Sequence, residues 1–319
     1  MHLNLSTCNF HGQIASEISH LSKLALLDLS QYSEDYIISI PDTSYYDIIS
    51  YPNTRFGQRD FSMLVHNLTH LSVLCLSAVD ISSEVPTNLS TSLSNLQLNR
   101  SGVCASVASL PLLSKLRIAQ NSLSGPVPSN FSGLQKLDVV YSYNSLNGTT
   151  PSWVFRHPSL RVLRLSHNQF TGQIDELEEN SSLELIFLNN NQLHGPIPGS
   201  ISKLLNLVWL DLSSNHLTGI VELNMFSNLE NFRMLYPSDN RLAWRIVNDV
   251  NLSLPNLIYL GLSSCGLKEV PEFFRNSKSL STLELSNNTI RQLPSWFTST
   301  SSWEILNYLN FKSNQLKGP

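Results

Sequence analysis

One motif recurs along this chain of 319 residues and limits the folds open to it. Aligning residues 160–172 (LRVLRLSHNQFTG), 183–198 (LELIFLNNNQLHGPIP) and 207–219 (LVWLDLSSNHLTG) gives the pattern LxxLxLxxNxLxGxIP. A unit of this length cannot bury its apolar side chains alone, so successive units must stack on one another. The sequence therefore predicts an array of stacked coils.

The Asn of the motif gives each coil an index position. Successive index positions are mostly 20 to 26 residues apart, with one step of 47 residues from Tyr32 to Val79. This spacing is the period of leucine-rich repeats. We expect about thirteen coils, with index positions at Cys8, Tyr32, Val79, Ser101, Asn121, Asn144, Asn168, Asn191, Asn215, Asn240, Cys265, Asn288 and Asn314.

The two halves of the motif predict different structures. In the LxxLxLxxN half, leucines such as Leu210 and Leu212 point inward from a short strand, and Asp211 between them points outward. The Asn side chain that follows can satisfy buried backbone groups and form a ladder through the stack. In the LxGxIP half, Gly permits a turn and Pro ends strand pairing. We therefore expect an α/β leucine-rich-repeat solenoid, a right-handed superhelix with a parallel concave sheet and an irregular or 3-10 convex side.

The four cysteines are too few and too widely spread for a disulfide scaffold or a zinc site. Cys8 and Cys265 occupy index positions, where a thiol can replace Asn, so we expect both to be buried structural residues. Cys75 lies at an outward strand position and is a candidate exposed thiol. Cys104 carries no such signal.

Nine Asn-x-Ser/Thr sequons are spread over the whole array. They favour passage through the secretory route and N-glycosylation, although a chain rich in Asn and Ser also produces such triplets by chance. The sequons lie at Asn4, Asn67, Asn88, Asn99, Asn130, Asn147, Asn180, Asn251 and Asn287.

Charge and motif content argue against several classes of function. Only 14% of residues are charged and the formal net charge is -4, so no basic stripe indicates a nucleic-acid partner. No apolar run approaches the ~18 residues of a spanning helix. No known catalytic or phosphate-binding motif occurs, so we expect no enzyme, no metal and no cofactor.

The LxGxIP half, in residues 123–134 (LSGPVPSNFSGL) and 193–207 (LHGPIPGSISKLLNL), resembles the plant extracellular class of leucine-rich repeats. Residues 2–30 and the later HNLTHLSVLCLSAVDISSEVPTNL are similar to the N-terminal repeats of Cf-type plant disease-resistance receptor-like proteins. The resemblance implies a parent protein on the extracellular side of the plasma membrane. It also implies cysteine-paired caps, which residues 1–319 lack at both ends, so we expect a single partial repeat domain.

The function implied by this resemblance is immune perception. The parent would bind a pathogen- or damage-derived protein, peptide or glycan and signal through a co-receptor or adaptor kinase. Two alternatives remain open, a secreted hydrolase inhibitor of the polygalacturonase-inhibiting type and the ectodomain of a peptide-hormone receptor kinase. The paired caps of the inhibitors are missing here, which counts against the first.

Two segments are candidates for ligand binding. Large side chains at outward strand positions form a band whose residue types are enriched in binding hot spots, although scattered apolar residues on a surface are also ordinary. The interruption at about residues 33–66, rich in Tyr, is an island loop that is either a binding lid or a passive insertion. The band comprises Arg117, Arg161, Arg164, Phe187, Trp209, Asp211, Tyr236 and Tyr259.

Overall fold

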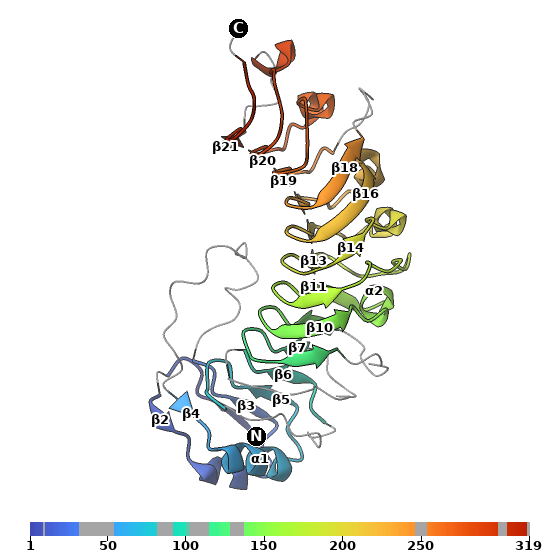
Figure 1. Cartoon of the computed structure of the whole chain (residues 1–319). Helices are drawn as coiled ribbons and strands as arrows, with labels where there is room; N and C mark the ends of the chain where they lie inside the picture. The colour runs from blue at the N-terminus through green and yellow to red at the C-terminus, as the bar shows by residue number, and fades with distance from the viewer. Residues whose placement is uncertain are drawn as a thin grey trace. The chain divides into compact units, whose positions relative to one another are not determined.

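The computed structural model describes residues 1–8, 10–31, 54–81, 92–99, 101, 115–127, 137–245, 254–298 and 305–317. The chain divides into two compact units, Met1–Asn147 and Gly148–Pro319. Both units consist of stacked coils, and each coil contributes one short parallel strand to the main sheet (Figure 1).

The first unit contributes six strands, which pair in chain order. Leu3 lies opposite Leu27, and Leu27 lies opposite Leu74, so equivalent residues of successive coils are neighbours. The strands are β1 (His2–Asn4), β3 (Leu26–Asp28), β5 (Val73–Cys75), β6 (Asn95–Gln97), β7 (Lys115–Arg117) and β9 (Leu137–Val140).

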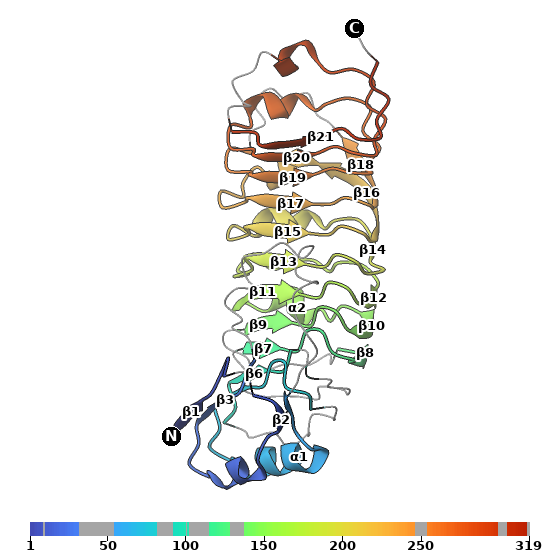
Figure 2. The same cartoon turned by 90° about the vertical axis from the view of Figure 1, so that its left-hand side faces the viewer.

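The second unit contributes seven strands in the same manner. Figure 2 shows these strands side by side in chain order. They are β11 (Leu160–Arg164), β13 (Leu185–Phe187), β15 (Trp209–Asp211), β17 (Met234–Tyr236), β19 (Tyr259–Gly261), β20 (Thr282–Glu284) and β21 (Tyr308–Asn310). The thirteen strands among the described residues agree with the expected number of about thirteen coils and confirm the solenoid class.

The leucines of the motif form the core, as the pattern predicts. The central strand residues Leu210 and Leu235 are 1% and 0% exposed, and Leu212 beyond β15 is 1% exposed. Full burial of such a side chain contributes about 1.5–3 kcal/mol, and it depends on a coil on either side. At the edge strand β21 the equivalent Leu309 is 37% exposed.

The far side of each coil holds short strands and short helices. In the first unit β2 (Gly12–Gln13) pairs with β4 (Thr54–Arg55), and β8 (Ser124–Pro126) pairs with β10 (Ser145–Thr149). In the second, β14 (His194–Gly195), β16 (His216–Glu222) and β18 (Arg241–Arg245) form a three-stranded sheet, and β12 is Gln169–Thr171. The helices are α1 (Gln58–Asn67), α2 (Trp153–Arg156) and the 3-10 turns η1 (Ser16–His20), η3 (Gly199–Lys203), η4 (Leu223–Phe226), η5 (Glu272–Asn276) and η6 (Ser295–Thr298).

The index Asn residues form the expected ladder. The Asn215 amide donates to the carbonyl of Leu188 in the preceding coil at 2.9 Å and to that of Leu212 at 3.1 Å, and its Oδ1 accepts from the Leu193 backbone N–H at 3.0 Å. Just before the index residue the backbone is left-handed, with φ of 53° at Ser214. The same conformation, φ of 52° to 58°, precedes ten further index positions among the described residues. This left-handed turn places the side-chain amide of the index Asn against the backbone of the preceding coil.

The predicted island loop at residues 33–66 contains regular structure in its last part. Residues 54–66 are not loop, because β4 pairs with β2 and α1 packs against η1. The Tyr-rich part of the predicted island loop, residues 32–53, lies outside the described residues.

Candidate functional site

The outward positions of the second unit share one face of its sheet. Because alternate strand residues point the same way, the first and third residues of β13 to β21 lie opposite the buried leucines. We call this surface the outer sheet face. It brings together five of the eight predicted binding residues, and Arg164 of β11 lies beside them at the next strand. The five are Phe187, Trp209, Asp211, Tyr236 and Tyr259.

Four aromatic side chains on this face touch in sequence; we call them the aromatic row. Phe187 meets Trp209 edge-on at 4.8 Å between ring centroids, and Trp209 stacks on Tyr236 at 5.7 Å. Tyr236 stacks closely on Tyr259, with centroids 3.9 Å apart and planes 14° from parallel. At the other end the guanidinium of Arg164 lies over the Phe187 ring at 4.2 Å. Such pairs contribute about 0.5–1.5 kcal/mol beyond the burial of their area.

This packing buries side chains that the sequence suggested would be open to solvent. Phe187 is 1% exposed and Trp209 8%, while Asp211 and Arg164 are also buried. The physical reason is the spacing of parallel strands, about 4.8 Å, which brings large side chains of successive coils into contact. Only the Tyr236 and Tyr259 end of the aromatic row is half-exposed. The accessible part of the predicted band is thus its tyrosine end.

A glycine makes the tyrosine stack possible. Gly261 occupies the outward position next to Tyr236, and a Cβ there would lie 3.2 Å from Cε1 of Tyr259 and 3.3 Å from Oγ of Ser238. The Tyr259 ring therefore crosses the space that a side chain at residue 261 would fill. This lets it reach Tyr236 on the neighbouring strand.

Two carboxylates accompany the tyrosines. Asp211 accepts hydrogen bonds from the Ser213 backbone N–H at 3.0 Å and from its hydroxyl at 2.7 Å. Burial raises the pKa of Tyr259 to about 12, and the negative charges of Glu284 and Asp211 add to this effect. Burial likewise raises the pKa of Tyr236, whose hydroxyl donates to that of Tyr259. Both phenols are therefore neutral at physiological pH.

Glu284 is held in its ionised form. Burial alone would raise the pKa of Glu284, but hydrogen bonds from Ser286, Asn310 and Tyr308 outweigh this and keep the pKa below its usual value. The Ser286 backbone N–H donates at 3.1 Å and the Asn310 amide at 3.0 Å. Glu284, Asn310 and Tyr308 were absent from the predicted band. The same alternation of outward positions, continued to β20 and β21, would have included these three residues.

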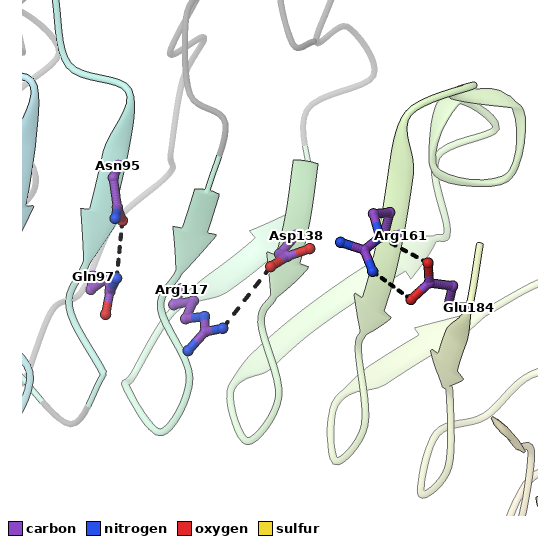
Figure 3. Close-up of polar contacts among 6 residues, drawn as sticks. All are labelled: Asn95, Gln97, Arg117, Asp138, Arg161 and Glu184. Atoms are coloured by element: carbon purple, nitrogen blue, oxygen red, sulfur yellow. Dashed lines mark hydrogen bonds and ion pairs between the residues drawn. The ribbon is translucent and has the colours of Figure 1, made fainter. Parts of the chain in front are cut away.

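The remaining two predicted residues are paired elsewhere. Arg161 forms a bidentate pair with Glu184, with Nε and Nη2 donating at 2.9 and 2.8 Å (Figure 3). Arg117 belongs to the first unit, where it is buried and its Nη2 lies 4.0 Å from Oδ2 of Asp138. An exposed pair such as that of Arg161 contributes at most about 1 kcal/mol.

The cysteine predictions hold in part. Cys265 is buried, its Sγ donates to the Ser263 carbonyl at 3.4 Å, and burial raises its pKa to about 12. Cys8 is exposed, so its expected burial is wrong, because its coil lies at the edge of the stack. Cys75 is buried at 6% exposure, so its expected exposure is wrong as well. Cys104 lies outside the described residues.

The described sequons differ in accessibility. Asn99 is buried, and its Oδ1 accepts from the Ala119 backbone N–H at 2.7 Å. That side chain is part of the fold, so we do not expect a glycan on it. Asn67 is half-buried, while the sequons at 88, 130 and 251 lie outside the described residues. The exposed ones are Asn4, Asn147, Asn180 and Asn287.

Other kinds of site find little support. The described residues contain no group of three His, Cys, Asp or Glu side chains able to share a metal ion. A small cavity in the second unit is lined by apolar core residues such as Phe155, Ile186 and Leu210, without a polar group to orient a ligand. In the part of the chain that the structure describes, no helix has the length and apolar character needed to cross a membrane.

Comparisons with known proteins agree with this geometry. The family model described as Leucine Rich Repeat matches residues 159–180, 182–204, 206–229 and 279–300. Receptor like protein 24 of Arabidopsis thaliana is 29% identical over 99% of this chain and 39% of its own length. Receptor like protein 27 of the same plant is 33% identical over 50% of this chain and 17% of its own length. The chain thus spans well under half of these curated relatives.

Solved structures show the same fold. The Arabidopsis receptor kinase HAESA, in complex with the peptide hormone IDA and the co-receptor SERK1, is 27% identical, with a TM-score of 0.73 over 99% of this chain and 50% of that one. An internalin from Listeria monocytogenes, 19% identical, has a TM-score of 0.67 over 99% of this chain and 82% of its own. The chain is a leucine-rich-repeat solenoid, and in sequence it resembles the plant extracellular receptor-like proteins.

Proposed function

We propose that this chain forms part of the extracellular ligand-recognising region of a plant cell-surface receptor, and that the outer sheet face of residues 148–319 binds a pathogen- or damage-derived peptide. The aromatic row carries the proposal. Its rings are fixed by their neighbours on a rigid sheet, so little conformational entropy is lost when a ligand covers them. Tyrosine is among the residues that most often dominate binding energy.

The relatives support a receptor role. The names of the curated relatives describe receptor-like proteins, and HAESA was solved with a peptide hormone and a co-receptor. By the same reasoning the parent of this chain signals through a partner kinase. A peptide ligand is favoured over a glycan because the HAESA ligand is a peptide.

A receptor carrying these coils allows a direct test. The double variant Tyr236→Ala/Tyr259→Ala removes the half-exposed end of the aromatic row, and we expect it to shift the dose-response to an active apoplastic peptide fraction by about 30-fold, the size of a 2 kcal/mol hot spot. The matched control is Ile220→Ala in β16, which removes a 58% exposed apolar side chain from the far side of the coil. Equal responses of both variants and wild type, at equal surface abundance, would eliminate this face as the ligand site.

The extracellular assignment has its own test. Behind a supplied signal peptide, the chain should be secreted with N-glycans on Asn4, Asn147, Asn180 and Asn287, the exposed described sequons. Asn99 should stay unmodified because its side chain is buried and hydrogen-bonded. Glycopeptide mass spectrometry measures both. A glycan on Asn99 in the folded product would contradict the placement of that residue.

A further inference from the structure

The strand positions at the tyrosine end of the outer sheet face include acidic side chains but no basic ones. None of the ten outward positions from β15 to β21 is Lys or Arg, while Asp211 and Glu284 are acidic. The hydrogen-bond donors on the oxygens of Glu284 are all neutral, and no described cation forms an ion pair with this carboxylate. The donors are the backbone N–H and hydroxyl of Ser286, the Asn310 amide and the Tyr308 hydroxyl. The hydrogen bonds that lower the pKa of Glu284 keep its carboxylate ionised, so its negative charge is available to a cationic ligand.

Register places this carboxylate beside the tyrosine stack. Gly261 and Glu284 are partners on adjacent strands, so their backbones lie about 4.8 Å apart. The Tyr259 ring crosses the outward side of Gly261, within 3.2 Å of where its Cβ would be. Glu284 is therefore a direct neighbour of the Tyr259 ring, and Tyr308 follows on the next strand at 49% exposure.

We propose that the Tyr236–Tyr259 stack and the Glu284 carboxylate form a recognition site for the cationic side chain, arginine or lysine, of the peptide ligand. This inference rests on the proposed function and names the chemistry of its ligand. Tyrosine rings attract a cation through their π-electrons, and a carboxylate binds it by charge-assisted hydrogen bonds. The planar guanidinium of arginine meets both requirements, since it stacks on aromatic rings and offers parallel N–H groups to a carboxylate.

The hydrogen bonds around Glu284 prepare the site. A carboxylate has about four lone-pair positions, and the N–H and hydroxyl of Ser286, the Asn310 amide and the Tyr308 hydroxyl already use them, so an incoming N–H takes the place of the exposed Tyr308 hydroxyl. Ser286 binds Oε1 and Asn310 binds Oε2, which fixes the orientation of the carboxylate without neutralising it. Such preorganisation lowers the entropic cost of binding. At the opposite end of the aromatic row Arg164 covers Phe187, so a cation is disfavoured there.

Matched peptide probes test the site on the complete secreted chain. Ac-Gly-Arg-Gly-amide is compared with its citrulline counterpart, which keeps the shape of arginine but not its charge, by ligand-detected NMR titration. Glu284→Gln removes the charge at nearly constant size. Its control is Glu269→Gln, which removes an exposed charge at a turn of the same unit.

We expect the arginine peptide to bind wild type and Glu269→Gln equally and Glu284→Gln about ten-fold more weakly, as loss of one charge-assisted hydrogen bond implies. The citrulline peptide should bind weakly to all three proteins. A second variant, Thr282→Lys, places a lysine between Tyr259 and Tyr308 in the register and should abolish arginine binding by occupying the site.

Several results would overturn the inference. One is equal binding of the arginine and citrulline peptides, and another is equal binding of the arginine peptide by Glu284→Gln and Glu269→Gln. A third is no binding of the arginine peptide up to its solubility limit. A fourth is binding of chitotetraose instead of the peptide, which would show that the tyrosines bind carbohydrate. The proposed function is separable from this test. A receptor whose dose-response depends on Tyr236 and Tyr259 but not on Glu284 would keep the function and refute the cation site.

Discussion

Replacing Asn215 by Ala tests whether the Asn ladder holds the coils together. The side chain is 4% exposed, and its amide and Oδ1 bond backbone groups of the preceding coil, the Leu188 carbonyl and the Leu193 N–H. Alanine leaves the Leu193 N–H without its acceptor, whereas the Leu188 carbonyl keeps the hydrogen bond from the Asn191 amide at 3.1 Å. A buried backbone group left without a partner costs about 1–3 kcal/mol, so the variant should lose about that much. This loss is a substantial fraction of the 5–15 kcal/mol typical of a folded domain.

Hydrogen exchange followed by mass spectrometry is the suitable assay, because repeat arrays open locally and a single unfolding free energy is poorly defined for them. Faster exchange should centre on peptides that contain Leu193, whose backbone N–H loses its acceptor. The control is Asn215→Cys, since Cys265 shows that a thiol fits this position and can donate to a carbonyl. We expect it to lose less stability than Asn215→Ala. Unchanged exchange in the alanine variant would refute the reasoning.

Three further predictions concern the core, the thiols and the tyrosine stack. Leu212→Asp should prevent folding of the second unit, because an unpaired carboxylate replaces a side chain that is 1% exposed, whereas Leu212→Met should keep the thermal midpoint nearly unchanged. Iodoacetamide at pH 8 should label Cys8, which is exposed, and spare Cys265, because burial raises the pKa of Cys265 to about 12 and leaves little thiolate. Equal labelling of the two cysteines, measured by mass spectrometry, would contradict this prediction. Gly261→Ala should displace the Tyr259 ring, lower the free energy of unfolding by about 1–3 kcal/mol and change the near-ultraviolet circular dichroism spectrum. An unaltered spectrum would show that the ring does not cross that position.

The sequence predicts the fold well because each element depends on neighbours in the same repeat. Leu210 and Leu212 are inward and Asn215 bonds the preceding coil, as the motif implies. The left-handed residue before each index position was not predicted. His167, Asn190 and Ser214 all occupy it, so no residue type marks it. The conformation also precedes Cys8, Val79 and Cys265, so it does not depend on Asn at the index position. Instead, the backbone N–H of the left-handed residue donates to a carbonyl of the next coil, as Ala78 does to Asn99.

The far side between β3 and β5 shows the same limit. Residues 54–66 were assigned to the island loop because the spacing from Tyr32 to Val79 exceeds one repeat. The strand and helix there form by contacts with β2 and η1 of the preceding coil. Their sequence has no LxGxIP spacing, so only the position of neighbouring coils reveals their role.

The binding face was harder to predict because its exposure depends on pairs of coils. Alternation correctly placed Phe187 and Trp209 outward, but it cannot show that Trp209 covers Phe187, since the two are 22 residues apart in sequence. Gly261 shows the same dependence on neighbouring coils. In the sequence it contributes no side chain to the predicted band, yet this absence lets Tyr259 reach Tyr236. The shape of such a face is set by the contacts between successive coils, so a substitution on one strand changes the surface that its neighbour presents to a ligand.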